Sequence, residues 1–142
     1  MKKILVINGP NLNMLGKREK NIYGDKTLEK INASLNVLAK SKNIDLEFFQ
    51  SNHEGEIIDI LHDERLWAEG VLINPGAFAH YSYAIRDAIS SINIPIVEVH
   101  ISDINNREDF RKKSVISDVC KATISGKGKN SYLEGLRFLI KN

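Results

Sequence analysis

Side chains that can transfer protons or form hydrogen bonds gather at three places in this sequence, each following a run of apolar residues. They are Asn11, Arg18, Tyr23, Asn74, His80, Glu98, His100 and Ser102. Histidine, tyrosine and carboxylate groups act as general acids and bases, asparagine and serine form neutral hydrogen bonds, and arginine keeps its charge in a closed site. The set predicts proton-transfer chemistry, and it has no evident metal-ligand spacing.

Each of these residues also has an ordinary structural explanation. A loop asparagine often serves a turn, a histidine at a strand end is often only a hydrogen-bonded structural residue, and most arginines are solvated at the surface. The functional interpretation therefore depends on whether the three segments meet in space.

The elements that would position these residues alternate along the chain. Five runs rich in apolar and β-branched residues predict strands, from Ile4 to Asn8, Asp45 to Ser51, Gly70 to Asn74, Ile94 to His100 and Ala122 to Ser125. Helical periodicity lies between and after them, at residues 28–41 behind the N-cap Thr27, near 57–61, at 84–89 and at 133–140. A further short helix is expected from Asn105 to Phe110.

This alternation predicts an α/β fold with a parallel sheet and right-handed crossovers. Five strands in a chain of this length favour the flavodoxin-like, three-layer arrangement with strand order 2-1-3-4-5. In such sheets, ligands bind beyond the carboxyl ends of the strands, near the switch point between strands one and three. The three polar segments follow strands one, three and four, so we expect them to line one crevice. The long segment from Gly9 to Lys26 predicts a lid over that crevice.

Length and composition limit the class of protein. The 142 residues, of which 42% are hydrophobic, fit a single domain spanning residues 1–142. A formal net charge of +2 gives no argument for nucleic acid or an anionic membrane as a partner. The opening apolar run stops at Asn8, short of a secretory core, and the single cysteine, Cys120, can form no internal disulfide. These features favour a cytoplasmic location.

Several segments together resemble those of the type II 3-dehydroquinate dehydratases. They are Gly9-Pro10-Asn11-Leu12-Asn13, Gly16-Lys17-Arg18-Glu19 with Tyr23-Gly24, Asn74 to Ser82, Glu98-Val99-His100-Ile101-Ser102, and Phe110-Arg111 with Ser114. They occur in the family's order over nearly the whole chain. The resemblance implies a flavodoxin-like fold and the dehydration of 3-dehydroquinate to 3-dehydroshikimate without a cofactor or metal. It implies a place in the shikimate pathway of aromatic amino acid biosynthesis or in quinate breakdown.

The resemblance also implies a role for each matching residue. Tyr23 would be the base that removes the proton beside the substrate carbonyl, with Arg18 and Arg111 favouring its phenolate form. Asn11 would hold the enolate oxygen through an ordered water, and His100 would protonate the leaving hydroxide while Glu98 orients its imidazole. The positions implied to bind substrate are Asn74, Gly76, Ala77, His80, Asp87, Ile101 (through its backbone), Ser102 and Arg111.

Asp87 matches a family position that reaches into a neighbouring subunit's site, which implies a homo-oligomer, a dodecamer built from trimers. The chain departs from the family pattern at Lys20, where proline is usual, at Ala79, where threonine is common, and at Lys112-Lys113, where a histidine pair is frequent. These departures concern lid stiffness and substrate affinity.

Two other interpretations stay open at this point. A flavodoxin-like nucleotide-binding or response module would use the same fold, because fold alone does not determine function. The first loop, however, has no Gly-rich phosphate fingerprint opening a helix. An oligomer that has kept the fold and lost activity is the second alternative, and the departures from the family pattern are its support.

Overall fold

The sheet has the predicted number and order of strands. The computed structural model describes residues 1–17 and 19–142, and five parallel strands lie in the order β2-β1-β3-β4-β5. The strands are β1 Lys2–Asn8, β2 Ile44–Gln50, β3 Gly70–Asn74, β4 Ile96–Val99 and β5 Ala122–Ile124. In the pairing of β1 with β3, Asn8 lies opposite Asn74, so both strands end at the same level.

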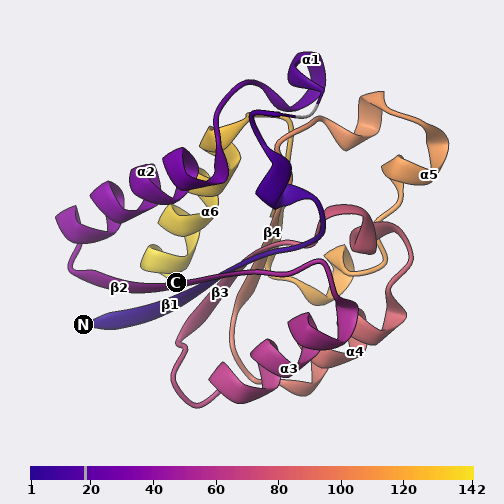
Figure 1. Cartoon of the computed structure of the whole chain (residues 1–142). Helices are drawn as coiled ribbons and strands as arrows, with labels where there is room; N and C mark the ends of the chain where they lie inside the picture. The colour runs from indigo at the N-terminus through magenta and orange to yellow at the C-terminus, as the bar shows by residue number, and fades with distance from the viewer. Residues whose placement is uncertain (18) are drawn as a thin grey trace.

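Helices cover both faces of this sheet (Figure 1). On one face lie α2 Leu28–Ser41 and α6 Lys129–Lys141, and on the other lie α3 Glu54–Glu64 and α4 Tyr83–Ser91. The shorter helices are α1 Lys20–Tyr23 and α5 Asp109–Lys112, with 3-10 turns η1 Leu12–Met14, η2 Gly76–His80, η3 Ile104–Asn106 and η4 Ser117–Val119. Apart from η4, which leads into the start of β5, these short elements lie in the connections that follow the carboxyl ends of β1, β3 and β4.

Each face of the sheet has its own apolar core. Ile4 and Val6 of β1 pack into the core under α2 and α6, whereas Leu5 and Ile7 pack into the core under α3 and α4. Successive strand residues point to opposite faces, so a strand covered on both sides needs a continuous apolar run. The near-continuous apolar runs in the sequence are explained by these two layers.

Local capping explains where two of the helices begin. The backbone N–H of Lys30 donates to Thr27 Oγ1 at 3.2 Å, which confirms the predicted N-cap of α2. Ser82 caps α4 in the same way, because its Oγ accepts the N–H of Ile85 at 3.0 Å.

The expected helix from Asn105 to Phe110 is wrong in detail. The segment forms η3 and α5 as separate pieces, because Asp103 caps η3 and Arg107 between them is extended, with φ −115° and ψ −171°. The fourth strand is also shorter than predicted and begins at Ile96, directly after Pro95, whose nitrogen cannot donate to a ladder. In the described residues 1–17 and 19–142, no helix has the length and apolar character to cross a membrane.

Candidate active site

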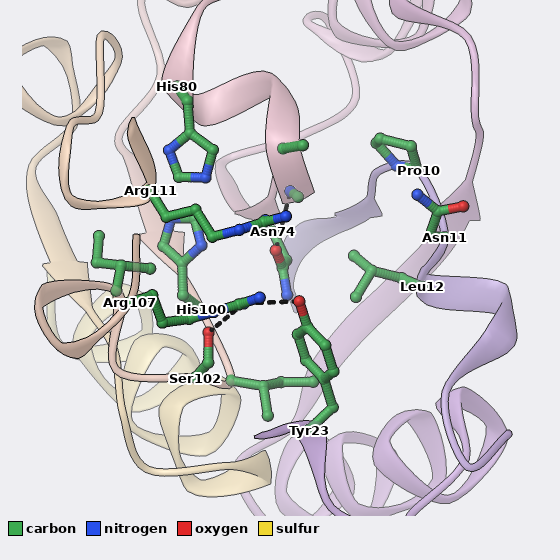
Figure 2. A pocket seen from close by; sticks show the side chains of 14 residues that line it. Pro10, Asn11, Leu12, Tyr23, Asn74, His80, His100, Ser102, Arg107 and Arg111 are labelled. Carbon is green, nitrogen blue, oxygen red and sulfur yellow. Dashed lines mark hydrogen bonds between the residues drawn. The ribbon is translucent and has the colours of Figure 1, made fainter. Parts of the chain in front are cut away.

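One pocket lies beyond the carboxyl ends of β1, β3 and β4 and gathers most of the predicted site residues (Figure 2). Its lining residues are Pro10, Asn11, Leu12, Tyr23, Asn74, Gly76, Ala77, His80, His100, Ile101, Ser102, Ile104, Arg107 and Arg111. The three polar segments thus meet at the edge where parallel strands with covered faces are expected to bind ligands.

The His100 side chain is held from behind by Glu98. Glu98 Oε2 lies 2.6 Å from His100 Nε2, and the carboxylate is fully buried. It also accepts hydrogen bonds from the hydroxyls of Ser117 at 2.6 Å, Ser114 at 3.0 Å and Thr123 at 3.2 Å. Because Nε2 is engaged by Glu98, Nδ1 is the ring nitrogen with which His100 can serve the pocket.

The charge of Glu98 is maintained by these contacts. Burial acts to raise the pKa of this carboxyl, but the hydrogen bond and charge of His100 and the serine hydroxyls together hold that pKa below its usual value. A carboxylate in this position holds the imidazole beside it in a fixed orientation at the pocket.

The Tyr23 hydroxyl is contacted by an arginine that the sequence analysis did not select. Arg107 Nη1 donates to Tyr23 Oη at 2.6 Å and to Ser102 Oγ at 3.3 Å, and its guanidinium lies 5.1 Å from the centre of the Tyr23 ring (Figure 2). A cation at hydrogen-bond distance from the phenol oxygen can stabilise negative charge that develops on that oxygen during a reaction. The signal for Arg107 was its position in the irregular segment after the fourth strand, four residues before Arg111.

Arg111 and Arg18 were expected to lie near Tyr23 and stabilise its phenolate, and the structure tests this expectation only for Arg111. Arg111 lines the same pocket, but its Nε donates to Glu108 at 2.6 Å. Arg18 lies outside the described residues.

His80 presents one ring nitrogen to the backbone. Its Nδ1 lies 2.7 Å from the carbonyl oxygen of Lys113, which can only accept, so Nδ1 carries the proton. Burial lowers the pKa of His80, and the nearby positive charges of His100 and Arg111 lower it further, against the raising effect of the Lys113 hydrogen bond. A neutral ring with Nδ1 protonated leaves Nε2 as an acceptor for a ligand hydroxyl.

Asn74 and Gly76 form a tight turn at the end of β3. Asn74 Oδ1 accepts the N–H of Gly76 at 3.1 Å, and the Asn74 carbonyl accepts the N–H of Gly9 at 2.8 Å. Gly76 has φ +58°, and a Cβ there would lie 3.1 Å from the carbonyl oxygen of Pro10. Only glycine tolerates both this conformation and this approach of the first loop, which brings Gly76 and Ala77 to the pocket wall.

Asn11 is held by residues at the end of β2 and directly after it. Its backbone is left-handed, with φ 68°, and its N–H donates to Asn52 Oδ1 at 3.0 Å. Gln50 Nε2 donates to the same Asn52 oxygen at 3.2 Å and to the Gly9 carbonyl at 3.2 Å. Asn52 and Gln50 were not predicted from the sequence, because their role depends on β2 lying beside β1.

Asp87 does not line the pocket of its own chain, and it is exposed on α4.

Ile101 and Ser102 line the pocket, and hydrogen bonds hold their loop in place. Their carbonyls accept the N–H groups of Gly128 and Gly126, each at 3.1 Å. Among the described side chains, no group of three or more His, Cys, Asp or Glu residues is arranged to hold a metal ion.

Comparison with known proteins gives consistent matches in sequence and structure. The profile of the family described as dehydroquinase class II matches residues 2–140. The 3-dehydroquinate dehydratase of Thermotoga neapolitana is 55% identical over 139 residues, which cover 98% of this chain and 94% of that protein. That of Bacillus pumilus is 53% identical over 140 residues, with 99% and 95% covered. The crystal structure of the type II dehydroquinase from Butyrivibrio crossotus superimposes with a TM-score of 0.95 at 52% identity, covering 97% of each chain.

Proposed function

This chain belongs to the class II dehydroquinase family, and we propose that it is a hydro-lyase that converts 3-dehydroquinate to 3-dehydroshikimate and water. The observation that carries the proposal is that the Tyr23–Arg107 pair and the His100–Glu98 pair line or back one pocket. A phenol beside a cation is equipped to be a base, and an imidazole beside a carboxylate is equipped to be an acid.

The first step is removal of the proton next to the substrate's ketone by the Tyr23 phenolate. The electron pair of the broken C–H bond moves into the carbonyl and forms an enolate. Arg107 stabilises the phenolate before the step, and Arg111 adds positive charge in the pocket. Arg18 is assigned the same role from its position in the family's sequence motif. Asn11 donates, through an ordered water, to the enolate oxygen as its charge develops.

The second step is loss of the hydroxyl group on the carbon next to the deprotonated one. The enolate electrons form the new C=C bond while the C–O bond breaks, and His100 gives its proton to the departing oxygen, so water leaves. Glu98 stabilises the imidazolium before this transfer. Tyr23 then carries an extra proton and His100 lacks one, and exchange with solvent restores both, so the cycle uses no cofactor.

Substrate recognition in this proposal uses the remaining pocket residues. Neutral donors and acceptors suit the several hydroxyls of the substrate, and backbone N–H groups and Arg111 suit its carboxylate. The residues assigned to binding are Asn74, Gly76, Ala77, His80, Ile101, Ser102 and Arg111. Asp87 would act in the site of a neighbouring subunit in a dodecamer built from trimers. We place the reaction in the cytoplasm, in aromatic amino acid biosynthesis or quinate breakdown.

The test is a spectroscopic assay with a matched variant. Purified protein mixed with 3-dehydroquinate should produce the ultraviolet absorption of a conjugated enone-carboxylate. Tyr23→Phe keeps the ring and removes the hydroxyl, so turnover should fall roughly a hundredfold or more. The affinity of the variant for an unreactive substrate analogue should stay near that of the wild-type protein. An absence of product with the wild-type protein would refute the activity, and a variant that keeps more than about a tenth of the wild-type rate would refute Tyr23 as the base.

A further inference from the structure

Three buried polar side chains form a hydrogen-bonded chain behind the pocket, joining β1, α6 and β3. Tyr132 Oη donates to Asn8 Oδ1 at 2.6 Å, and Asn74 Nδ2 donates to Tyr132 Oη at 2.9 Å. Tyr132 is 0% exposed, Asn8 1% and Asn74 3%. Asn74 lines the pocket, whereas Tyr132 and Asn8 do not, so the chain reaches the site only through Asn74.

The directions of these bonds fix which way the Asn74 amide faces. The backbone N–H of Gly76 can only donate, so the atom 3.1 Å from it must be Asn74 Oδ1. The single proton of the Tyr132 hydroxyl goes to Asn8, so this hydroxyl accepts from Asn74 Nδ2. Turning the amide over would place two donors against each other at Gly76. Each internal bond uses one donor or acceptor position of the amide, which leaves one N–H and one lone pair to be aimed at a ligand.

The position of α6 is what brings the Tyr132 hydroxyl to the strand ends. Gly135, one turn further along α6, faces the sheet, and a Cβ there would lie 2.5 Å from Leu72 Cδ1 and 2.9 Å from Val99 Cγ1. A larger residue would require these core side chains to repack or the helix to shift. The Tyr132 ring itself packs in the apolar core between α6 and the sheet, where phenylalanine would serve equally well apart from the hydroxyl.

We propose that Tyr132 is a positioning residue for Asn74, and that the C-terminal helix thereby sets how tightly the pocket binds a hydroxylated ligand. The inference rests on the proposed function in one respect, that Asn74 contacts the substrate. Burial raises the pKa of Tyr132, so its hydroxyl stays protonated and the bond to Asn8 does not titrate in the working pH range. Among the described contacts, this chain of side chains reaches the pocket through Asn74, which the proposed function assigns to substrate binding, so we expect the effect on binding.

Tyr132→Phe is the direct test, because it removes only the hydroxyl. The Asn74 amide then keeps its bond to the Gly76 N–H but loses the acceptor for its Nδ2, so it is held less tightly. KM should therefore rise about tenfold while kcat changes less than about threefold. The ratio of variant to wild-type KM should be constant between about pH 6 and pH 9, since no titrating group is removed. A fall in kcat with unchanged KM would overturn the proposal.

A double-mutant cycle with Asn74→Ala separates positioning from general damage. If Tyr132 acts through Asn74, Tyr132→Phe should change KM less than about twofold in the Asn74→Ala background. Full additivity of the two effects would overturn the inference while leaving the role of Asn74 intact. A wild-type KM in Asn74→Ala would instead refute substrate contact by Asn74, and the inference with it, although the dehydration assay would still succeed.

Leu136→Val is the matched control, because it removes buried volume one turn along α6 without touching the polar chain. It should lower the urea midpoint and leave KM unchanged, so an equal rise in KM there would also overturn the proposal. If Tyr132→Phe does not fold, Asn8→Ala replaces it in the double-mutant cycle with Asn74→Ala. Without Asn8, the Tyr132 hydroxyl proton can turn towards Asn74, where it opposes the Nδ2 donor. The criterion of non-additivity with Asn74→Ala stays the same.

Discussion

Glu98 shows how a single buried charge can serve both stability and chemistry. It is fully buried beneath the pocket and accepts hydrogen bonds from His100, Ser114, Ser117 and Thr123. A buried carboxylate is unfavourable unless its oxygens are paired, and here hydroxyls and an imidazole supply that pairing. The contact between Glu98 and His100 also orients the imidazole. Glu98, whose burial is unfavourable for folding, therefore positions the proposed acid His100.

Glu98→Gln should therefore lower stability in a pH-dependent way. The folded-state pKa of Glu98 is held below the ordinary value of 4.5 for a glutamate, so its stabilising contribution is present above that value and is lost as the pH falls through the folded pKa. The variant should be less stable than wild type at neutral pH, with the gap in urea midpoint narrowing below about pH 4. Turnover at neutral pH should fall about tenfold or more, because His100 loses its orienting partner.

Asp118→Asn is the control for that experiment. Asp118 pairs with Arg86 at the surface, and exposed pairs contribute little to stability. The urea midpoint of the Asp118→Asn variant should therefore change with pH in the same way as that of the wild-type protein. Parallel curves for wild type and Glu98→Gln would contradict the assignment of the acid-dependent stability to Glu98.

At the scale of elements, local patterns predicted most of the fold. Apolar runs gave the five strands, and Thr27 marked the start of α2, because strand burial and capping depend on residues close in sequence. The contacts that were missed join distant segments. Arg107 lies 84 positions from Tyr23, and Tyr132 lies 124 positions from Asn8. Such contacts depend on how irregular turns and a whole helix pack, which periodicity does not encode.

The segment between β1 and α2 supports a prediction about ligand-induced closure. It carries Tyr23 on α1, a single short helix with no buried residue, although Leu12 and Leu15 earlier in the segment are buried. Tyr23 packs against the core but is only partly buried, and an element with no buried residue is expected to open locally at a low free-energy cost. Limited trypsin cleavage after Lys17 or Lys20 should slow when a substrate analogue is bound, because the ligand would bridge Tyr23 to the pocket. Cleavage after the exposed Lys42, beyond α2, should keep its rate, and equal cleavage at Lys20 with and without the analogue would argue against closure.

At the scale of the whole molecule, one face of α4 has features of a subunit interface. Tyr83 and Asp87 are four residues apart and so lie on the same side of the helix, and Tyr83 is 59% exposed. Tyr81 and Phe110, which are next in sequence to the pocket residues His80 and Arg111, are 59% and 58% exposed. Tyrosine and phenylalanine are enriched in protein interfaces. Since Asp87 does not line its own chain's pocket, a role in catalysis requires a second copy of the chain.

Asp87→Ala should then lower activity, and mixed assemblies should recover part of it. In a ring of identical subunits, each site would combine Tyr23 of one chain with Asp87 of the next. When Tyr23→Phe and Asp87→Ala proteins are dissociated and reassembled in equal amounts, about a quarter of the sites should have both intact residues, because each of the two requirements is met in about half of the chains. Activity should rise well above that of either variant reassembled alone, and mixing without dissociation should give no rise. A mixture no more active than its two components would place Asp87 outside the site, and a wild-type monomer with full activity at low concentration would remove the need for a neighbour altogether.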